Sequence, residues 1–311
     1  MKRDKRLLLL PGLMVCLAHA AVAVQPLEIP LWPPGTLPKI EGAKPERVII
    51  RGRKKPDRSV TNVTVPTLTV YLPDGQETNT MAVVICPGGA YSHLAIDKEG
   101  NAVACWLNTL GIAGIVLKYR MPRPDLSDGQ TPWPILDGAR AVRLVRSHAA
   151  DWNIDPHRVG LMGFSAGGHV ASSVGTHFDE ISGIVTDVVD QLSARPDFLV
   201  LVYPVISMQP PVTHRGSRRS LLGPKPDPKM VALYSNELHV TPQTPPTFLV
   251  QARDDPISVQ NSLLFYAALQ RAGVPSELHV FEKGGHGFGL GVNGSEPAEW
   301  PALCAVWLKN L

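Results

Sequence analysis

The stretch Gly163-Phe164-Ser165-Ala166-Gly167-Gly168-His169 decides the fold. An apolar run at 159–162 precedes it, and residues with helical spacing follow it. A serine in the pattern G-x-S-x-G forms a sharp turn between a buried strand and a helix. The flanking glycines are needed because side chains there would collide with neighbouring backbone. The stretch therefore predicts that Ser165 stands at the carboxyl edge of a sheet, at the start of a helix.

Apolar runs and helical patterns alternate on both sides of this turn. Runs typical of buried strands cover 81–86, 112–119, 158–164, 198–204, 247–252 and 277–281. Helical spacing covers 96–110, 135–152, 166–176, 262–272 and 298–311. Residues 46–72 are extended, and only this N-terminal part is expected to be antiparallel. The order predicts a single α/β domain with a mostly parallel central sheet and helices on both faces.

The net charge of the chain comes from its first residues. The chain has 311 residues, 44% of them hydrophobic, and a formal charge of +3. A basic start, a short apolar stretch and Ala21-Val22-Ala23 predict a signal peptide at 1–23 and a mature domain at 24–311. The rest of the chain is neutral, so we expect no nucleic-acid partner and no membrane contact after signal removal. The predicted location is secreted or periplasmic, and oligomeric state is left open.

One segment interrupts the alternation. Residues 207–246 are rich in proline and lack a core of their own, so we interpret them as an insertion over the active-site edge of the sheet. The mature chain keeps Cys86, Cys105 and Cys304, too few and too widely spaced for a disulfide framework, although one pair remains open. No zinc spacing, phosphate loop or dinucleotide fingerprint occurs, so we expect no metal and no cofactor.

A serine becomes a nucleophile only beside a base, and that base needs an orienting acid. His286 is the best-placed histidine, on a glycine-rich loop after the strand 277–281. His169 lies one helical turn after Ser165 and is expected to be structural. The acid should follow the strand 247–252, where Asp254 and Asp255 are adjacent. The distance from the strand end favours Asp255, with Asp254 as second choice.

Acyl transfer also needs donors for an oxyanion. Pro87-Gly88-Gly89-Ala90-Tyr91 follows the first buried strand, and we expect the amides of Gly89 or Ala90, together with that of Ala166, to form the oxyanion hole. Tyr91 is expected to border the acyl pocket, and His93 to line the site.

These motifs resemble a known bacterial family. The stretches that carry the resemblance are Cys86–Tyr91, Glu99-Gly100, Trp106–Asn108, Leu117–Arg120, the serine turn, Asp254–Pro256 and Gly284–Gly287. They are similar to exported α/β-hydrolases related to acetylxylan esterases and small feruloyl esterases, which are often labelled xylanases on similarity alone. The likeness covers about residues 30 to 311. The chain departs from it at Ala90, where glycine is usual, and at Ile257-Ser258-Val259, where many members carry an additional Val-Pro.

The resemblance and the triad order together predict a serine carboxylesterase. Its expected substrate is an acylated, most simply acetylated, plant polysaccharide such as xylan, or an oligosaccharide derived from it. Feruloyl or other small esters are the alternative. A peptidase of the prolyl-oligopeptidase type would need a propeller domain, for which the chain has no room. A catalytically inactive scaffold protein would not need the serine, histidine and aspartate of a triad, and all three are present. A glycosidase needs paired carboxylates at a set spacing, and no such pair is recognisable.

Overall fold

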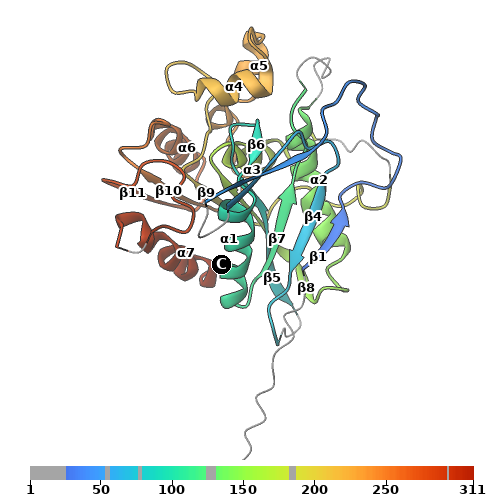
Figure 1. The fold of residues 1–311 in the computed structure, drawn as a ribbon. Helices are drawn as coiled ribbons and strands as arrows, with labels where there is room; N and C mark the ends of the chain where they lie inside the picture. Colours follow the sequence, from blue (N-terminus) through green and yellow to red (C-terminus); the bar gives the residue numbers. More distant parts are fainter. Residues whose placement is uncertain (1–25, 53–56, 76–78, 124–130, 182–186, 293) are drawn as a thin grey trace, which may run out of the picture.

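A computed structural model describes residues 26–52, 57–75, 79–123, 131–181, 187–292 and 294–311 (Figure 1). An eight-stranded sheet forms its centre. In spatial order the strands are β1 (Leu27–Pro30), β4 (Thr67–Tyr71), β7 (Ala113–Lys118), β5 (Thr80–Cys86), β8 (Ile154–Phe164), β9 (Leu199–Val202), β10 (Thr247–Ala252) and β11 (Ser276–Phe281). The predicted signal peptide at 1–23 lies outside the described residues.

The six strands from β7 to β11 in this order are parallel. β1 pairs with β4, and β4 with β7, in the antiparallel sense. The predicted mixture of a parallel centre and an antiparallel N-terminal portion is therefore confirmed, and the chain has the α/β-hydrolase fold. Because parallel strands end at the same edge, the loops after β5, β8, β10 and β11 meet there.

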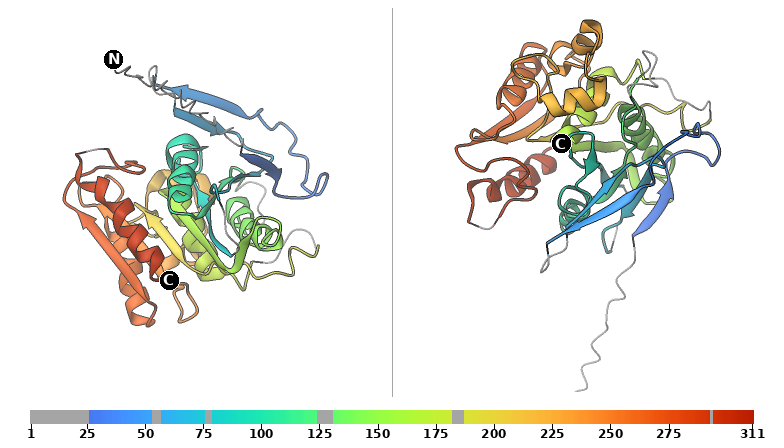
Figure 2. Two further views of the ribbon diagram at one scale, coloured as in Figure 1. Left: turned by 90° about the horizontal axis from the view of Figure 1, so that it is seen from below. Right: turned by 45° about the horizontal axis from the view of Figure 1, so that its top comes forward.

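Helices cover both faces of the sheet (Figure 2). One face carries α1 (Ala102–Thr109) and α7 (Trp300–Lys309), and the other carries α2 (Trp133–Ser147), α3 (Ala166–His177) and α6 (Gln260–Arg271). The side chains of β5 alternate between the two cores: Val84 and Cys86 pack against one face, and Val83 and Ile85 against the other. This alternation explains why the strand is apolar throughout.

The predicted helices differ from the observed ones at their ends, and three of the differences involve a change of helix type or geometry. The helix predicted over 96–110 begins as a π-helical segment, η1 (Asp97–Asn101), before α1. The helix predicted over 135–152 ends at Ser147, because His148 leaves helical geometry at φ −97° and ψ 9°. The helix predicted over 298–311 begins with η3 (Glu296–Glu299) and ends at Lys309.

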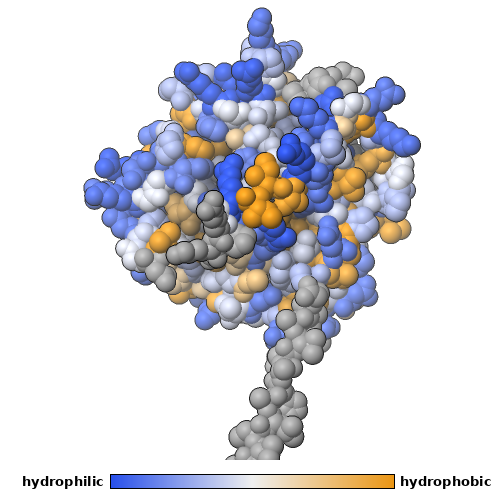
Figure 3. Space-filling model, viewed as in Figure 1, coloured by the Kyte–Doolittle hydropathy of each residue, from blue (hydrophilic) through white to orange (hydrophobic). Residues whose placement is uncertain are grey.

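A second, three-stranded sheet lies beside the central one. It contains β2 (Arg47–Arg51), β3 (Asp57–Thr61) and β6 (His93–Leu94) in that order. β2 is an edge strand with exposed Val48 and Ile50. Figure 3 shows apolar residues gathered near the middle of one face of the molecule, bordered by hydrophilic ones. The pairing of β3 with β6 connects this sheet to the segment that follows β5.

The segment 207–246 lies over the carboxyl end of the sheet, at the top of Figure 1. It contains α4 (Arg215–Leu222), α5 (Pro228–Leu233) and η2 (Asn236–Leu238). Buried Asn236 donates hydrogen bonds to Ser172 and Ser173 of α3, at 2.7 and 3.0 Å. No described helix is long and apolar enough to cross a membrane. Each of the three described cysteines is a free thiol, so the open disulfide pairing is not formed.

Candidate active site

Ser165 lies between the end of β8 and the start of α3, in a strained backbone conformation of φ 53° and ψ −117°. The neighbouring glycines make this turn sterically feasible. A Cβ atom on Gly163 would lie 2.2 Å from the carbonyl oxygen of Gly167, and one on Gly167 would lie 2.0 Å from that of Cys86. Neither contact is physically possible. The sequence pattern therefore fixes the position of the serine through backbone packing.

Three side chains from separate loops meet at Ser165. The Nε2 atom of His286, on the loop after β11, lies 2.9 Å from the Ser165 hydroxyl oxygen. Its Nδ1 atom lies 2.8 Å from Oδ2 of Asp255, on the loop after β10. The Asp255 side chain is fully buried, and its Oδ1 accepts a 2.7 Å bond from the amide of Ile257. A buried carboxylate held in this way orients the imidazole towards the serine.

Asp254 points elsewhere. Its Oδ1 accepts a 2.8 Å hydrogen bond from the amide of Gly285, the residue before His286. Of the two adjacent acids, Asp255 therefore contacts the histidine ring, while Asp254 holds the backbone of the histidine loop. Asp255, rather than Asp254, therefore remains the proposed acid of the triad.

The loop after β5 lies beside Ser165 and carries the expected oxyanion donors. Gly89 has φ 137°, and a Cβ atom there would lie 2.0 Å from the carbonyl oxygen of His93. Ala90 is also in the left-handed region, at φ 54°. Among the described residues, the Gly89 and Ala90 amides donate no hydrogen bond. Ala166 is the first residue of α3, where helical amides lack intrahelical partners.

A cavity of about 480 Å³ opens at Ser165, and Gly89, Ala90, His93 and His286 are among the residues that line it. The structure differs from the prediction for Tyr91, which does not border this cavity. Tyr91 is only 2% exposed.

The Tyr91 hydroxyl lies 2.8 Å from Nδ1 of buried His169, and the Nε2 atom of His169 lies 2.8 Å from the carbonyl oxygen of Tyr234. Because φ is 60° at Tyr91, the chain turns this ring inward. Burial lowers the pKa of His169 to about 4, so its neutral ring donates to the carbonyl and accepts from Tyr91. Through its hydrogen bond with Tyr91, His169 thus stabilises the loop that follows β5.

Four residues at or near the cavity were not predicted from the sequence to be part of the site. Glu99 and Lys98 from η1 line the cavity, as does His214 from the segment 207–246. Burial lowers the pKa of His214, and the positive charge of His286 contributes in the same direction. Tyr203 follows β9, and its ring meets that of His286 edge-on at a centroid distance of 4.9 Å. Glu99 was noted only as part of the family resemblance, with no role assigned to it. No motif marks Lys98, Tyr203 or His214, because only the topology brings these residues to Ser165.

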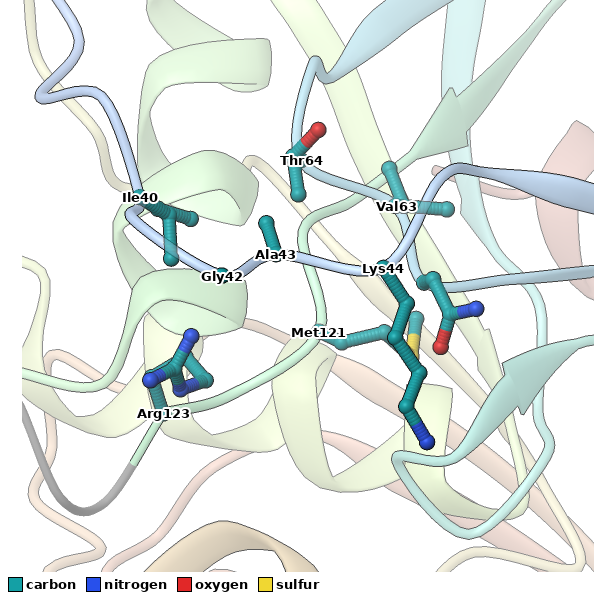
Figure 4. Close-up of a pocket in the computed structure, with 9 residues that line it drawn as sticks. Ile40, Gly42, Ala43, Lys44, Val63, Thr64, Met121 and Arg123 are labelled. Atoms are coloured by element: carbon teal, nitrogen blue, oxygen red, sulfur yellow. The ribbon is translucent and has the colours of Figure 1, made fainter.

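A second hollow lies away from this site. It measures about 280 Å³ and is lined by residues including Ile40, Lys44, Thr64, Met121 and Arg123 (Figure 4). It shares no residue with the cavity at Ser165. Across the described chain, no group of three or more His, Cys, Asp or Glu side chains is placed to hold a metal ion.

The geometry at Ser165 is that of a serine hydrolase: a hydroxyl, an imidazole and a buried carboxylate in series, with unpaired amides beside the hydroxyl. The profile of the BD-FAE family matches residues 68–269, about two thirds of the chain. The chain therefore belongs to the BD-FAE family. The matched range contains Ser165 and Asp255, and it ends before His286.

Two curated proteins and one solved structure extend this comparison. The chain is 37% identical over 249 residues to an acetylxylan esterase of Xylanibacter ruminicola, covering 78% of this chain and 48% of the relative. It is 36% identical over 224 residues to endo-1,4-beta-xylanase B of Butyrivibrio fibrisolvens, covering 72% of this chain and 34% of the relative. The chain thus spans half or less of these relatives.

The solved structure covers nearly all of both chains. It is an acetyl ester-xyloside bifunctional hydrolase from Caldicellulosiruptor lactoaceticus, 41% identical, with a TM-score of 0.79. The match covers 94% of this chain and 98% of the other. The resemblance inferred from the sequence motifs is confirmed at the level of family and fold.

Proposed function

We propose that this protein is a serine carboxylesterase that removes acyl groups, acetyl first, from plant cell-wall polysaccharide such as xylan. The observation that carries the proposal is the series of short contacts from Ser165 through His286 to Asp255, at 2.9 and 2.8 Å. The names of the X. ruminicola and C. lactoaceticus proteins support the choice of an acetyl ester.

The reaction follows from these contacts. The Ser165 hydroxyl oxygen attacks the ester carbonyl carbon while Nε2 of His286 takes the proton, and Asp255 stabilises the resulting imidazolium. The amides of Gly89, Ala90 and Ala166 receive the oxyanion. The intermediate then collapses, the sugar hydroxyl leaves with the proton from His286, and the acyl group stays on the serine. Water, deprotonated by His286, releases the acid and restores the hydroxyl.

The cavity is consistent with a leaving group larger than an alcohol of a few atoms. Its volume of about 480 Å³ is within the range of small-ligand sites and exceeds the needs of an acetyl group. We infer that the remaining space receives the sugar. His93, Lys98 and His214 offer polar contacts to hydroxyl groups there.

The test compares the wild-type protein with Ser165→Ala. We expect wild-type protein to hydrolyse p-nitrophenyl acetate and release acetate from acetylated xylan, and the variant to lose both activities by about 10³-fold or more. If the protein hydrolyses p-nitrophenyl acetate but releases only feruloyl groups from plant polymer, its natural substrate is a feruloyl ester rather than an acetyl ester. A folded wild-type protein with no esterase activity would refute the proposal.

Xyloside hydrolysis, which the C. lactoaceticus name includes, is tested in the same preparation. Glycoside hydrolysis normally requires two carboxyl groups flanking the scissile bond. Glu99, which lines the cavity, is bonded to Gly88 and Tyr203, and Asp255 behind His286 is bonded to His286 and Ile257. We therefore expect no cleavage of p-nitrophenyl β-xyloside.

We also propose that residues 1–23 form a signal peptide and that the protein acts outside the cytoplasm. The basic start and the Ala21-Val22-Ala23 site support this. N-terminal sequencing of protein exported by a bacterial host should begin at residue 24. A start at residue 1 in the exported fraction would contradict the proposed cleavage.

A further inference from the structure

Glu99 is a buried acid that the triad does not use. It is only 4% exposed, and no ion pair joins it to a cation among the described residues. Burial raises its pKa, whereas the charge of Lys98 and two hydrogen bonds act in the opposite direction. Burying an acid is costly unless its oxygens accept hydrogen bonds, so the hydrogen-bond partners of Glu99 indicate its role.

Both carboxylate oxygens of Glu99 have partners in segments that shape the active site. Oε2 accepts a 2.8 Å bond from the amide of Gly88, one residue before the expected oxyanion donors. Oε1 accepts a 2.9 Å bond from the hydroxyl of Tyr203. The same Tyr203 oxygen accepts a 3.0 Å bond from the amide of Gly289, three residues after His286.

The hydrogen bonds of Glu99 are those of a carboxylate, because each of its two oxygens accepts from a donor. Tyr203 donates its one hydroxyl proton to Glu99, and the same oxygen accepts from the Gly289 amide. The Gly88 amide also donates to Glu99. A protonated Glu99 would need a further acceptor for its own proton in order to keep both of these bonds.

We propose that Glu99 is a positioning residue, whose carboxylate holds the oxyanion loop at Gly88 and, through Tyr203, the histidine loop at Gly289 in one fixed arrangement. This inference rests on the proposed esterase function, because it concerns the same acyl-transfer site. The fit at Gly88 is tight: a Cβ atom there would lie 2.6 Å from Oε2 of Glu99. Tyr203 adds a direct contact, since its ring packs edge-on against that of His286.

The charge of Glu99 also acts on His286. The positive charge of His286 is one of the factors that favour ionised Glu99, and the interaction is mutual. The groups that face His286 are Ser165, Asp255 and Tyr203 by direct contact, with Glu99, Lys98 and His214 across the cavity. Replacing Glu99 by a neutral group removes this negative charge, so its attraction to a positively charged His286 is lost.

The experiment uses Glu99→Gln, Tyr203→Phe and the double variant, with p-nitrophenyl acetate as substrate. We expect Glu99→Gln to lower kcat by about 10- to 100-fold, less than the roughly 10²- to 10³-fold cost of removing an oxyanion donor, with KM changed less than about threefold. The acidic limb of its kcat/KM profile should move to lower pH. Tyr203→Phe should lower kcat by about tenfold without moving that limb, because the charge remains. The double variant should lose less than the product of the two single losses.

Asp97→Asn is the matched control. It removes a negative charge from the same short helix, but Asp97 pairs with Arg58 and is not among the residues that line the cavity. We expect its kcat to stay within about twofold and its acidic limb to stay in place.

The outcomes separate this inference from the proposed function. If wild-type protein is active, Ser165→Ala is inactive and Glu99→Gln keeps wild-type kcat and pH profile, the positioning role is refuted while the esterase stands. If Glu99→Gln does not fold, Tyr203→Phe alone tests the proposal. This variant keeps the bond between Glu99 and the Gly88 amide, and it removes the hydroxyl that links Glu99 to the Gly289 amide. An unchanged kcat in that variant would overturn the proposal, and a lower kcat at constant KM would support it.

Discussion

Two adjacent aspartates after β10 have different roles because of the turn between them. The side chain of Asp255 is fully buried and lies 2.8 Å from His286, whereas Asp254 binds the amide of Gly285. From the sequence alone both follow the same strand, and only distance from the strand end favoured Asp255. The turn directs one carboxylate to the ring and the other to the backbone of the same loop.

The two acids should therefore differ strongly when each is replaced by asparagine. Asp255→Asn should lower kcat by about 10³- to 10⁴-fold, because the amide cannot stabilise the imidazolium or keep the correct tautomer. Asp254→Asn should lower kcat by less than about tenfold, since its amide oxygen still accepts from Gly285. Steady-state kinetics on p-nitrophenyl acetate measures both. Equal losses would show that the two roles are not separate.

His169 makes folding stability depend on pH. Burial lowers its pKa to about 4 from an ordinary value of 6.5, so the unfolded chain binds its proton first as pH falls. The stabilisation is complete above pH 6.5 and is lost as pH falls towards 4. The expected loss between pH 7 and pH 5 is about 2 kcal/mol. Urea unfolding at the two pH values measures it.

The control for this prediction is His169→Gln, which keeps a donor and an acceptor but does not titrate. Its stability should depend less on pH by about the same 2 kcal/mol. If wild type and variant show the same dependence on pH, another group is responsible.

At the scale of elements, the strands and helices that build the site were predictable. The G-x-S-x-G turn, the glycines after β5 and the loops after β10 and β11 mark the carboxyl ends of parallel strands, which must meet. Tyr203 and Glu99 were not predicted as site residues, and the reason is physical. Tyr203 carries a strained φ of 37° after β9, and Glu99 lies in a π-helical segment that the pattern could not distinguish from a regular helix.

The segment 207–246 contributes His214 to the cavity. From the sequence, only the position of the whole segment over the active-site edge was predicted, and no single residue of it was named. The Nδ1 atom of His214 accepts a hydrogen bond from the amide of Ser217, and so caps α4 at its N-terminus. Deleting the segment would also remove the buried contacts of Asn236 with α3. A single substitution therefore tests the role of the segment in substrate recognition better than a deletion.

His214→Asn should change recognition while keeping the helix cap, because asparagine is among the strongest N-cap residues. We expect KM for acetylated xylo-oligosaccharides to rise about fivefold, as the loss of one contact worth about 1 kcal/mol would give. KM for p-nitrophenyl acetate, which lacks the sugar, should change less than twofold. The ratio of the two KM values is the measurement, and an unchanged ratio would exclude His214 from sugar binding.

At the scale of the whole molecule, a buried charge cluster ties the N-terminal segment to the helices. Asp137 of α2 accepts a 2.8 Å bond from the Trp32 indole and pairs with Arg120 at 2.6 Å. Arg140, one turn further along α2, lies over the Trp32 ring and donates to the carbonyl of Leu31. β1 is an edge strand that pairs only with β4. The bonds to Leu31 and Trp32 therefore hold the chain where it leaves β1.

Asp137→Asn is expected to destabilise the fold by about 3 to 5 kcal/mol, because it leaves the guanidinium of Arg120 buried without a counter-charge. Both side chains are at most 2% exposed, so water cannot replace the lost partner. Arg58→Gln breaks the exposed pair with Asp97 and should cost less than about 1 kcal/mol. Urea unfolding at pH 7.5 compares the two variants with wild type. Equal and small losses would mean that the buried cluster does not hold the N-terminal segment, and that β1 pairing alone does.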